Sequence, residues 1–119
     1  MIQLTFASLQ VKDLEASKAF YTEKLGFEIE NANPQACVFK YNKGQASFAI
    51  RTPLEPLEDR ELGVGVALWF AVDEEVDRLR ESFIANALEG VGPIIVTPFG
   101  RAFHVRDIDG YKLTFLNER

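Results

Sequence analysis

Cysteine and histidine are almost missing from this chain. Cys37 is the single cysteine among 119 residues, so an intramolecular disulfide is excluded. It lies in an alternating apolar run, which favours a small buried side chain over a nucleophile. His104 is the single histidine, which excludes a metal site or a catalytic pair built from two histidines of one chain.

Basic residues are also scarce. The sequence has 13 Lys and Arg against 18 Asp and Glu, a formal net charge of −5. Nucleic acids and anionic membranes are recognised through basic surfaces, so neither is an expected partner. An acidic surface could attract a cationic ligand or simply favour solubility. No apolar run reaches the roughly 18 residues of a membrane span, and the N-terminus lacks a signal-peptide pattern. We expect a cytoplasmic protein.

The clearest pattern lies at the end of the chain, over residues 99–118. Apolar and polar residues alternate on both sides of Asp107-Ile108-Asp109-Gly110, as in two half-buried strands. Asp side chains accept hydrogen bonds from nearby backbone groups, and Gly110 can adopt a positive φ. The segment therefore predicts a β-hairpin that the rest of the chain packs against.

The first half of the chain predicts one strand, one helix and three strands. Asp13 is the expected helix N-cap, and Leu25-Gly26 the expected helix end. The Asn31–Pro34 segment, residues 31–34, is expected to be a turn, and residues 42–44 a hairpin loop. The predicted strands are 4–11, 27–30, 36–41 and 46–51.

The second half repeats this order after a linker-like, charged and proline-containing segment at 53–62. A strand at 64–72 is followed by Asp73 as the expected second N-cap. The expected helix carries an apolar stripe at Val76, Leu79, Phe83 and Ala87 and ends at Glu89-Gly90. A strand at 94–97 and the final hairpin complete the unit.

The repeated order predicts an α+β fold made of two βαβββ modules, residues 1–52 and 63–119, in a single domain over 1–119. Each module would be a curved mixed sheet with a helix on its convex face. Along the first strand, the residues that share a face with Phe6 point away from the helix. They lie on a concave face that would form a cleft. That face carries Phe6, Ser8, Gln10, Ala67, Trp69, Ala71, His104 and Thr114.

Two motifs carry a resemblance to a known family. The first is V-x-D-x-x-x-S-x-x-F-Y-x-x-x-L-G-F over residues 11–27, and the second is the D-x-D-G turn within residues 98–110. Together they resemble the vicinal oxygen chelate superfamily, which includes glyoxalase I, extradiol dioxygenases, fosfomycin resistance enzymes and bleomycin resistance proteins. The resemblance covers essentially the whole chain and implies paired βαβββ modules.

The family's enzymes hold a divalent metal with a His or Gln on the first strand, a His on the first strand of the second module and a Glu on the last strand. On these motifs the three positions fall at Phe6, Ala67 and Thr114. Phenyl and methyl groups have no lone pairs to place at about 2 Å from a metal, and a threonine hydroxyl is a weak ligand. The chain thus departs from the enzymes at every ligand position, and no metal, other cofactor or catalytic residue is expected.

Bleomycin resistance proteins of this family bind their drug without a metal, in a cleft between two chains. We therefore expect a homodimer that sequesters a cationic or aromatic small molecule in an apolar-aromatic cleft. Trp69 could form an aromatic wall that stacks on a ligand, or simply pack in the core or at a dimer interface. Phe99 could reach a partner's cleft. His104 could contact ligand or be a bystander, and the arginines could clamp an anion or form salt bridges. The expected ligand-binding residues are Phe6, Ser8, Gln10, Arg51, Ala67, Trp69, Phe99, Arg101, His104 and Thr114.

Three functions stay open at this level. The first is the metal-independent binding protein. The second is a lyase- or isomerase-like enzyme with altered chemistry, using His104 as general base and an arginine as anion clamp. The third is a non-catalytic structural or regulatory dimer, whose cleft is filled by Phe6 and Trp69.

Overall fold

The computed structural model describes residues 1–2, 4–40 and 47–118. The chain forms two compact units, Met1–Arg60 and Glu61–Arg119. The predicted linker at 53–62 and the exact module limits stay predictions. Residues 52–66 contain no helix or strand, although Leu57 within them is buried. The predicted loop at 42–44 lies outside the described residues.

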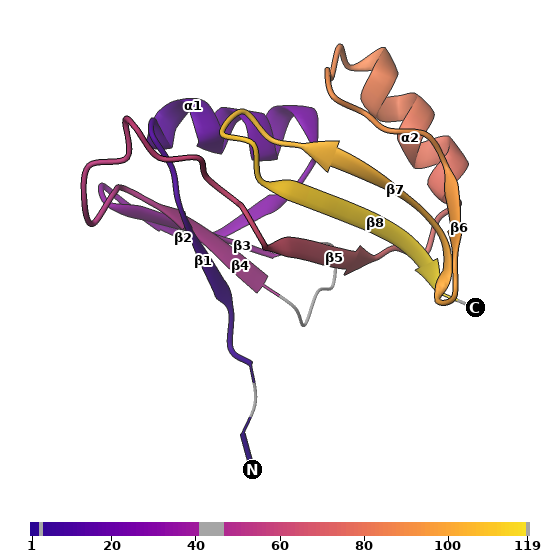
Figure 1. The fold of residues 1–119 in the computed structure, drawn as a ribbon, viewed down its shortest axis with the longest axis horizontal. Coiled ribbons are helices and arrows are strands. Elements are labelled where there is room, and N and C mark those ends of the chain that lie inside the picture. Colours follow the sequence, from indigo (N-terminus) through magenta and orange to yellow (C-terminus); the bar gives the residue numbers. More distant parts are fainter. Residues whose placement is uncertain (3, 41–46, 119) are drawn as a thin grey trace. The chain divides into compact units, whose positions relative to one another are not determined.

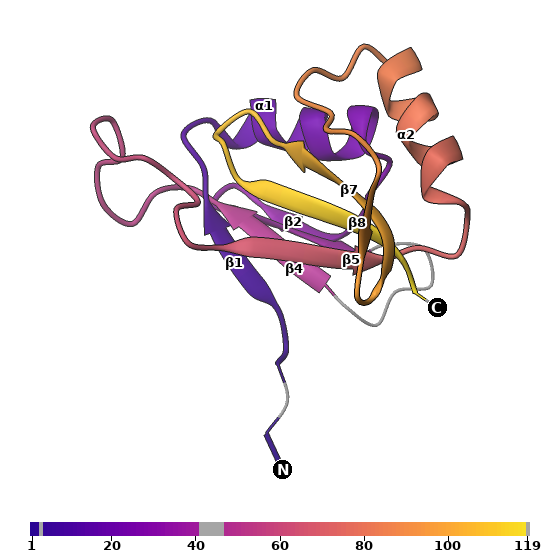
Figure 2. The same cartoon turned by 45° about the vertical axis from the view of Figure 1, so that its right-hand side comes forward.

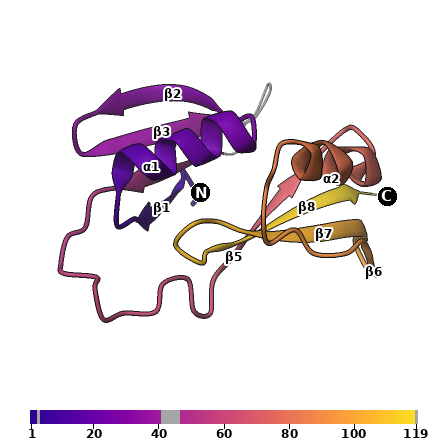
Figure 3. The ribbon, with the colours of Figure 1, turned by 90° about the horizontal axis from the view of Figure 1, so that it is seen from above.

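The first unit is a four-stranded sheet with one helical segment on one face (Figures 1 and 3). Strand order is β1-β4-β3-β2, with β1 parallel to β4 and the other pairs antiparallel. This is the predicted strand, helix, strand, strand, strand order. The elements are β1 (Ala7–Gln10), α1 (Leu14–Ala19), η1 (Phe20–Lys24), β2 (Glu28–Asn33), β3 (Ala36–Lys40) and β4 (Ser47–Arg51).

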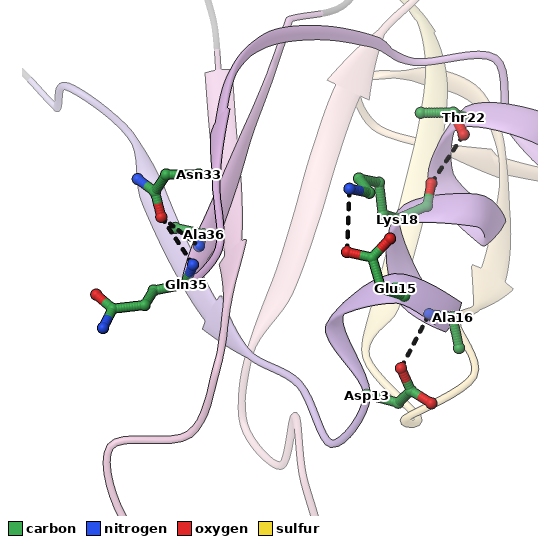
Figure 4. A network of polar contacts seen from close by, with 8 residues as sticks. All are labelled: Asp13, Glu15, Ala16, Lys18, Thr22, Asn33, Gln35 and Ala36. Atoms are coloured by element: carbon green, nitrogen blue, oxygen red, sulfur yellow. Dashed lines mark hydrogen bonds and ion pairs between the residues drawn. The ribbon is translucent and has the colours of Figure 1, made fainter.

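The helix begins as predicted. The Asp13 carboxylate accepts a hydrogen bond from the Ala16 N–H at 3.1 Å, and Lys18 pairs with Glu15 at 3.1 Å (Figure 4). Beyond Ala19 the α-helix widens into a π-turn, which the sequence did not predict. The Leu25 N–H there donates to the carbonyl of Phe20, and Gly26 then adopts a φ of +84°.

The predicted turn at 31–34 is wrong. β2 continues through Asn33, with a register shift between Ile29 and Asn31, and the reversal occurs at Pro34 and Gln35. The Asn33 side chain sets this turn, because its Oδ1 accepts from the N–H groups of Gln35 at 2.8 Å and Ala36 at 2.9 Å (Figure 4). Asparagine is common in turns because its side chain bonds to the nearby backbone. An asparagine at the end of a strand therefore looks, in the sequence, like part of a longer turn.

The second unit has the same topology, β5-β8-β7-β6, with β5 parallel to β8 (Figure 2). The turn between β7 and β8 is built as predicted: Asp107 Oδ1 accepts from the N–H groups of Asp109 at 2.9 Å and Tyr111 at 2.8 Å, and Gly110 has a φ of +97°. The elements are β5 (Ala67–Ala71), α2 (Val76–Ala85), β6 (Ile95–Thr97), β7 (Gly100–Arg106) and β8 (Lys112–Glu118).

Asp73 is not the N-cap of the second helix, which corrects the sequence prediction. The N-cap position is Glu75, whose side chain makes no capping bond. The cap comes from β8: Asn117 Oδ1 accepts from the Val76 N–H at 2.7 Å, and its Nδ2 donates to the carbonyls of Val72 and Glu74. A strand residue distant in sequence therefore accepts the hydrogen bond of a backbone N–H in the first turn of α2, which has no partner within the helix.

The helix also ends earlier than predicted, at Ala85 instead of Glu89-Gly90. Ala87 has a φ of +60°, its N–H donates to the carbonyl of Ile84, and the Leu88 N–H donates to the carbonyl of Phe83. This is a Schellman ending with alanine at the left-handed position. Val76, Leu79 and Phe83 are buried as expected, but Ala87 is exposed and Leu88 is buried instead.

Each sheet packs an aromatic core beneath its helix. Tyr21, Phe27, Phe39 and Phe48 form the first core, with ring centroids 5.1–6.3 Å apart. Phe83, Phe103 and Phe115 form the second, at 5.3–5.8 Å. Cys37 is buried, as the sequence indicated, and burial raises the pKa of its thiol. Among the described residues, neither helix is long and apolar enough to cross a membrane.

Candidate ligand-binding face

The second sheet has an open face, which we define by three cross-strand rows on β5, β8 and β7. These strands lie side by side in Figure 2. Side chains alternate across a strand, so residues two apart share a face. The rows are Ala67–Lys112–Arg106, Trp69–Thr114–His104 and Ala71–Leu116–Ala102. Opposite this face, Phe103, Val105, Leu113 and Phe115 are fully buried.

The middle row contains a polar contact between two strands. Thr114 is fully buried, and its Oγ1 lies 2.6 Å from Nδ1 of His104. Thr114 is therefore not a water-facing strand position. It lies between Trp69 and His104 in its row.

Aromatic side chains form the exposed part of this face. The ring of Trp69 meets that of His104 edge-to-face at 6.3 Å, and that of Phe99 edge-to-face at 6.2 Å. Trp69 remains 46% exposed and Phe99 65% exposed. Two large aromatic surfaces thus remain available beside a buried hydroxyl–imidazole pair, which is an arrangement that can pack against a flat ligand.

The charged residues of the open face are both cationic. Lys112 is half-buried and Arg106 exposed, and the Arg106 Nη1 donates to the carbonyl of Gly110 at 2.9 Å. Burial lowers the pKa of His104 below its ordinary value, and the positive charges of Lys112 and Arg106 lower it further. His104 is therefore a neutral hydrogen-bonding group at neutral pH.

Four predicted site residues belong to the first unit. Phe6 is 45% exposed just before β1, Ser8 is exposed on β1, and Gln10 and Arg51 are paired across β1 and β4. Gln10 Oε1 accepts from the Leu54 N–H at 2.9 Å, and Arg51 Nε donates to the Thr52 carbonyl at 3.0 Å. Both side chains thus have local partners.

Arg101 lies apart from the open face. It alternates with Ala102 along β7 and faces α2, where its Nη2 pairs with the Asp77 carboxylate at 2.7 Å. The hydrogen bond from Arg101 lowers the pKa of Asp77. Of the predicted site residues, the structure brings together Ala67, Trp69, His104 and Thr114 on one face of the second sheet, and places Phe99, in the turn between β6 and β7, beside Trp69.

Lys112 was not predicted from the sequence, although a signal for it exists. It lies two residues before Thr114 and therefore shares its strand face.

The residues at the family's metal positions do not fit a divalent metal. Phe6 and Ala67 offer no donor atom, and the Thr114 hydroxyl is buried and bonded to His104. No group of three or more His, Cys, Asp or Glu side chains suited to a metal gathers among the described residues.

Two units with the strand order βαβββ define a fold class that is shared by several kinds of protein. The family model described as the glyoxalase/bleomycin resistance protein/dioxygenase superfamily matches residues 3–115. The chain belongs to this superfamily. A search of curated proteins gives no significant match.

Solved structures with this fold include proteins of different activity. TnmS3, an antibiotic-binding protein from Streptomyces sp. CB03234, is 20% identical with a TM-score of 0.82, over 100% of this chain and 98% of that one. The bleomycin-binding protein of Streptomyces verticillus, complexed with copper(II)-bleomycin, is 22% identical with a TM-score of 0.76, over 100% of both chains. Lactoylglutathione lyase from Agrobacterium tumefaciens is 20% identical with a TM-score of 0.72, over 97% of this chain and 92% of that one.

Proposed function

We propose that this protein binds and sequesters a small aromatic molecule without a metal. The observation that carries the proposal is the open face of the second sheet, where Trp69 and Phe99 expose aromatic surface next to the Thr114–His104 pair. Apolar surface supplies affinity, and a few placed polar groups orient the ligand, as in most small-molecule sites.

The exposed aromatic surface is large enough to matter. A tryptophan side chain buries about 150–250 Å² when fully covered, and Trp69 is 46% exposed. Covering the remaining area, on the order of 100 Å², contributes roughly 2–3 kcal/mol at about 25 cal/mol per Å². Phe99 adds a similar term, which offsets part of the entropy lost on association.

Two further observations favour binding over family enzymology. The three metal positions carry Phe6, Ala67 and Thr114, so the Lewis-acid step of the enzymes has no ligand set. Among proteins of the same fold, TnmS3 is described as antibiotic-binding and the Streptomyces verticillus protein as bleomycin-binding. The lyase of Agrobacterium tumefaciens shares the fold too, so the chemistry of the site carries this proposal.

The proposal includes a homodimer in the cytoplasm, with the ligand enclosed at the interface between chains. Val64, Val66 and Trp69, on and before β5, are 70%, 51% and 46% exposed, and burial of such surface favours association. Light scattering after size-exclusion chromatography tests the dimer, and cell fractionation tests the location. A monomer at all concentrations, with and without ligand, would contradict it.

Trp69 is the only tryptophan of the chain, so its emission reports directly on the open face. We expect metal-free bleomycin, or another antibiotic of an aromatic panel, to raise the melting temperature and to change the Trp69 emission. The Trp69→Phe variant should keep a thermal shift but lose the emission signal. The same samples are assayed for S-lactoylglutathione formation from methylglyoxal and glutathione. Turnover would favour the enzyme, and no thermal shift with any panel member would contradict binding.

A further inference from the structure

The hydroxyl of Thr114 fixes the tautomer of His104. Thr114 is fully buried, and Nδ1 of His104 is the one hydrogen-bond partner of its hydroxyl within the part of the chain that the structure describes. A buried hydroxyl proton without an acceptor costs free energy. The hydroxyl therefore donates to the Nδ1 lone pair, and the imidazole proton resides on Nε2. His104 is thereby held as a neutral hydrogen-bond donor through Nε2.

The charged residues in the row next to this donor have one sign. None of the positions in the three rows of the open face carries a carboxylate, although the next register pair, Gly100 with Glu118, contains a glutamate and the chain as a whole has a net charge of −5. Lys112 and Arg106 occupy the row next to His104. The Arg106 guanidinium donates to the Gly110 carbonyl, whereas the Lys112 ammonium has no hydrogen bond or ion pair among the described residues.

These contacts specify the partner more narrowly than the proposed function does. A group that meets the Nε2–H of His104 must be an acceptor. An adjacent ammonium favours an acceptor with negative charge, and the half-exposed ring of Trp69 favours a flat apolar body. A cationic ligand would meet Lys112 and Arg106 with like charge.

Resting on the proposed function, we infer that the open face of the second sheet selects aromatic ligands that carry an anionic oxygen, such as a carboxylate or a phenolate. Trp69 packs on the ring, and His104 and Lys112 bind the oxygen. Thr114 acts as a positioning residue through His104. The selectivity for an anionic oxygen thus depends on two neighbouring rows of the second sheet, Trp69–Thr114–His104 and Ala67–Lys112–Arg106.

The test compares three ligands with one ring system and different charge: 2-naphthoate, 2-naphthamide and 2-naphthylmethylammonium, titrated by calorimetry into the full chain. We expect the carboxylate to bind more tightly than the amide, and the amide more tightly than the ammonium. In Lys112→Met the ratio of carboxylate to amide affinity should fall about fivefold, the scale of one partly exposed charge pair. Lys12→Met, which removes an exposed lysine of the first unit, should keep the wild-type ratio.

Thr114→Val tests the positioning role, because it keeps the shape and removes the hydroxyl. Carboxylate affinity should fall about tenfold, the scale of one hydrogen bond to a charged group, and Thr114→Ser should restore it. ¹⁵N NMR of His104 should show the Nε2–H tautomer in wild type and in Thr114→Ser, but a mixture in Thr114→Val. This spectroscopic readout is independent of ligand.

An ammonium that binds as tightly as the carboxylate, or a wild-type imidazole protonated at Nδ1, would overturn the inference. If antibiotics of the panel bind while the naphthalene series does not, the inference fails and the proposed function stands. If no aromatic ligand of any charge binds, the proposed function fails with it.

Discussion

The side-chain amide of Asn117, near the end of β8, lies at the N-terminus of α2, where its Oδ1 accepts a hydrogen bond from the Val76 N–H at 2.7 Å. Its Nδ2 binds the carbonyls of Val72 and Glu74, so one side chain joins strand β8, the end of β5 and the start of the helix.

Replacing Asn117 by Ala should lower the free energy of unfolding by about 1–2 kcal/mol, because a helix N-cap bond is lost and two carbonyls lose their donor. Urea denaturation followed by circular dichroism measures the change. Asp73→Ala is the matched control and should change stability by less than about 0.5 kcal/mol. A larger loss from the Asp73 variant than from the Asn117 variant would contradict the assignment of the cap.

Ala87→Gly should stabilise the protein by about 1 kcal/mol. Ala87 has a φ of +60°, a conformation that costs an L-residue roughly 1–2 kcal/mol and that glycine adopts freely. Ala85→Gly, the same change at the last residue of α2, should instead destabilise by up to about 1 kcal/mol. Thermal unfolding of the two variants should give shifts of opposite sign, and shifts of the same sign would refute the Schellman ending.

Stability should depend on pH through His104. In the unfolded chain its pKa is near the ordinary value of about 6.5, and in the folded protein burial and two neighbouring cations lower it. As the pH falls below about 6.5, the unfolded chain takes up a proton before the folded protein does, so the free energy of unfolding decreases. Above that pH neither state holds the proton, and this contribution is fully retained.

His104→Gln removes this proton uptake while the carboxylates of the chain titrate equally in both proteins. The unfolding free energies of wild type and variant are measured by urea denaturation from pH 7.5 to 5.0. As the pH falls, the unfolding free energy of the wild type should decrease relative to that of the variant. A constant difference over that range would show that the folded and unfolded pKa values of His104 are the same.

Local patterns predicted those parts of the fold that short segments determine. The alternation within the predicted strands 4–11 and 64–72, the Asp13 cap and the Asp107 turn each follow from neighbouring residues. Asp73 failed as a cap because Asn117, 44 positions later in numbering (117 − 73), provides the bond instead. Such a contact depends on the parallel pairing of β5 with β8, and no local pattern reports it.

The candidate site shows the same division. Alternation placed Trp69, His104 and Thr114 on one face, but only the strand register aligns them in a single row and puts Lys112 next to them. Arg101 seemed equivalent to other arginines in the sequence, yet its strand position turns it to Asp77 on α2. Faces can be read from alternation, whereas neighbours across a sheet depend on register.

The most direct test of metal-independent binding is one calorimetric titration of 2-naphthoate, performed on the full chain before and after exhaustive chelation. The account predicts the same dissociation constant in both states, with no change on adding Zn²⁺, Ni²⁺, Mn²⁺ or Fe²⁺, because Phe6, Ala67 and Thr114 offer no ligand set. Binding that disappears on chelation and returns with one of these ions would contradict metal-independent binding, whereas no binding of 2-naphthoate in either state would contradict the inferred anion selectivity.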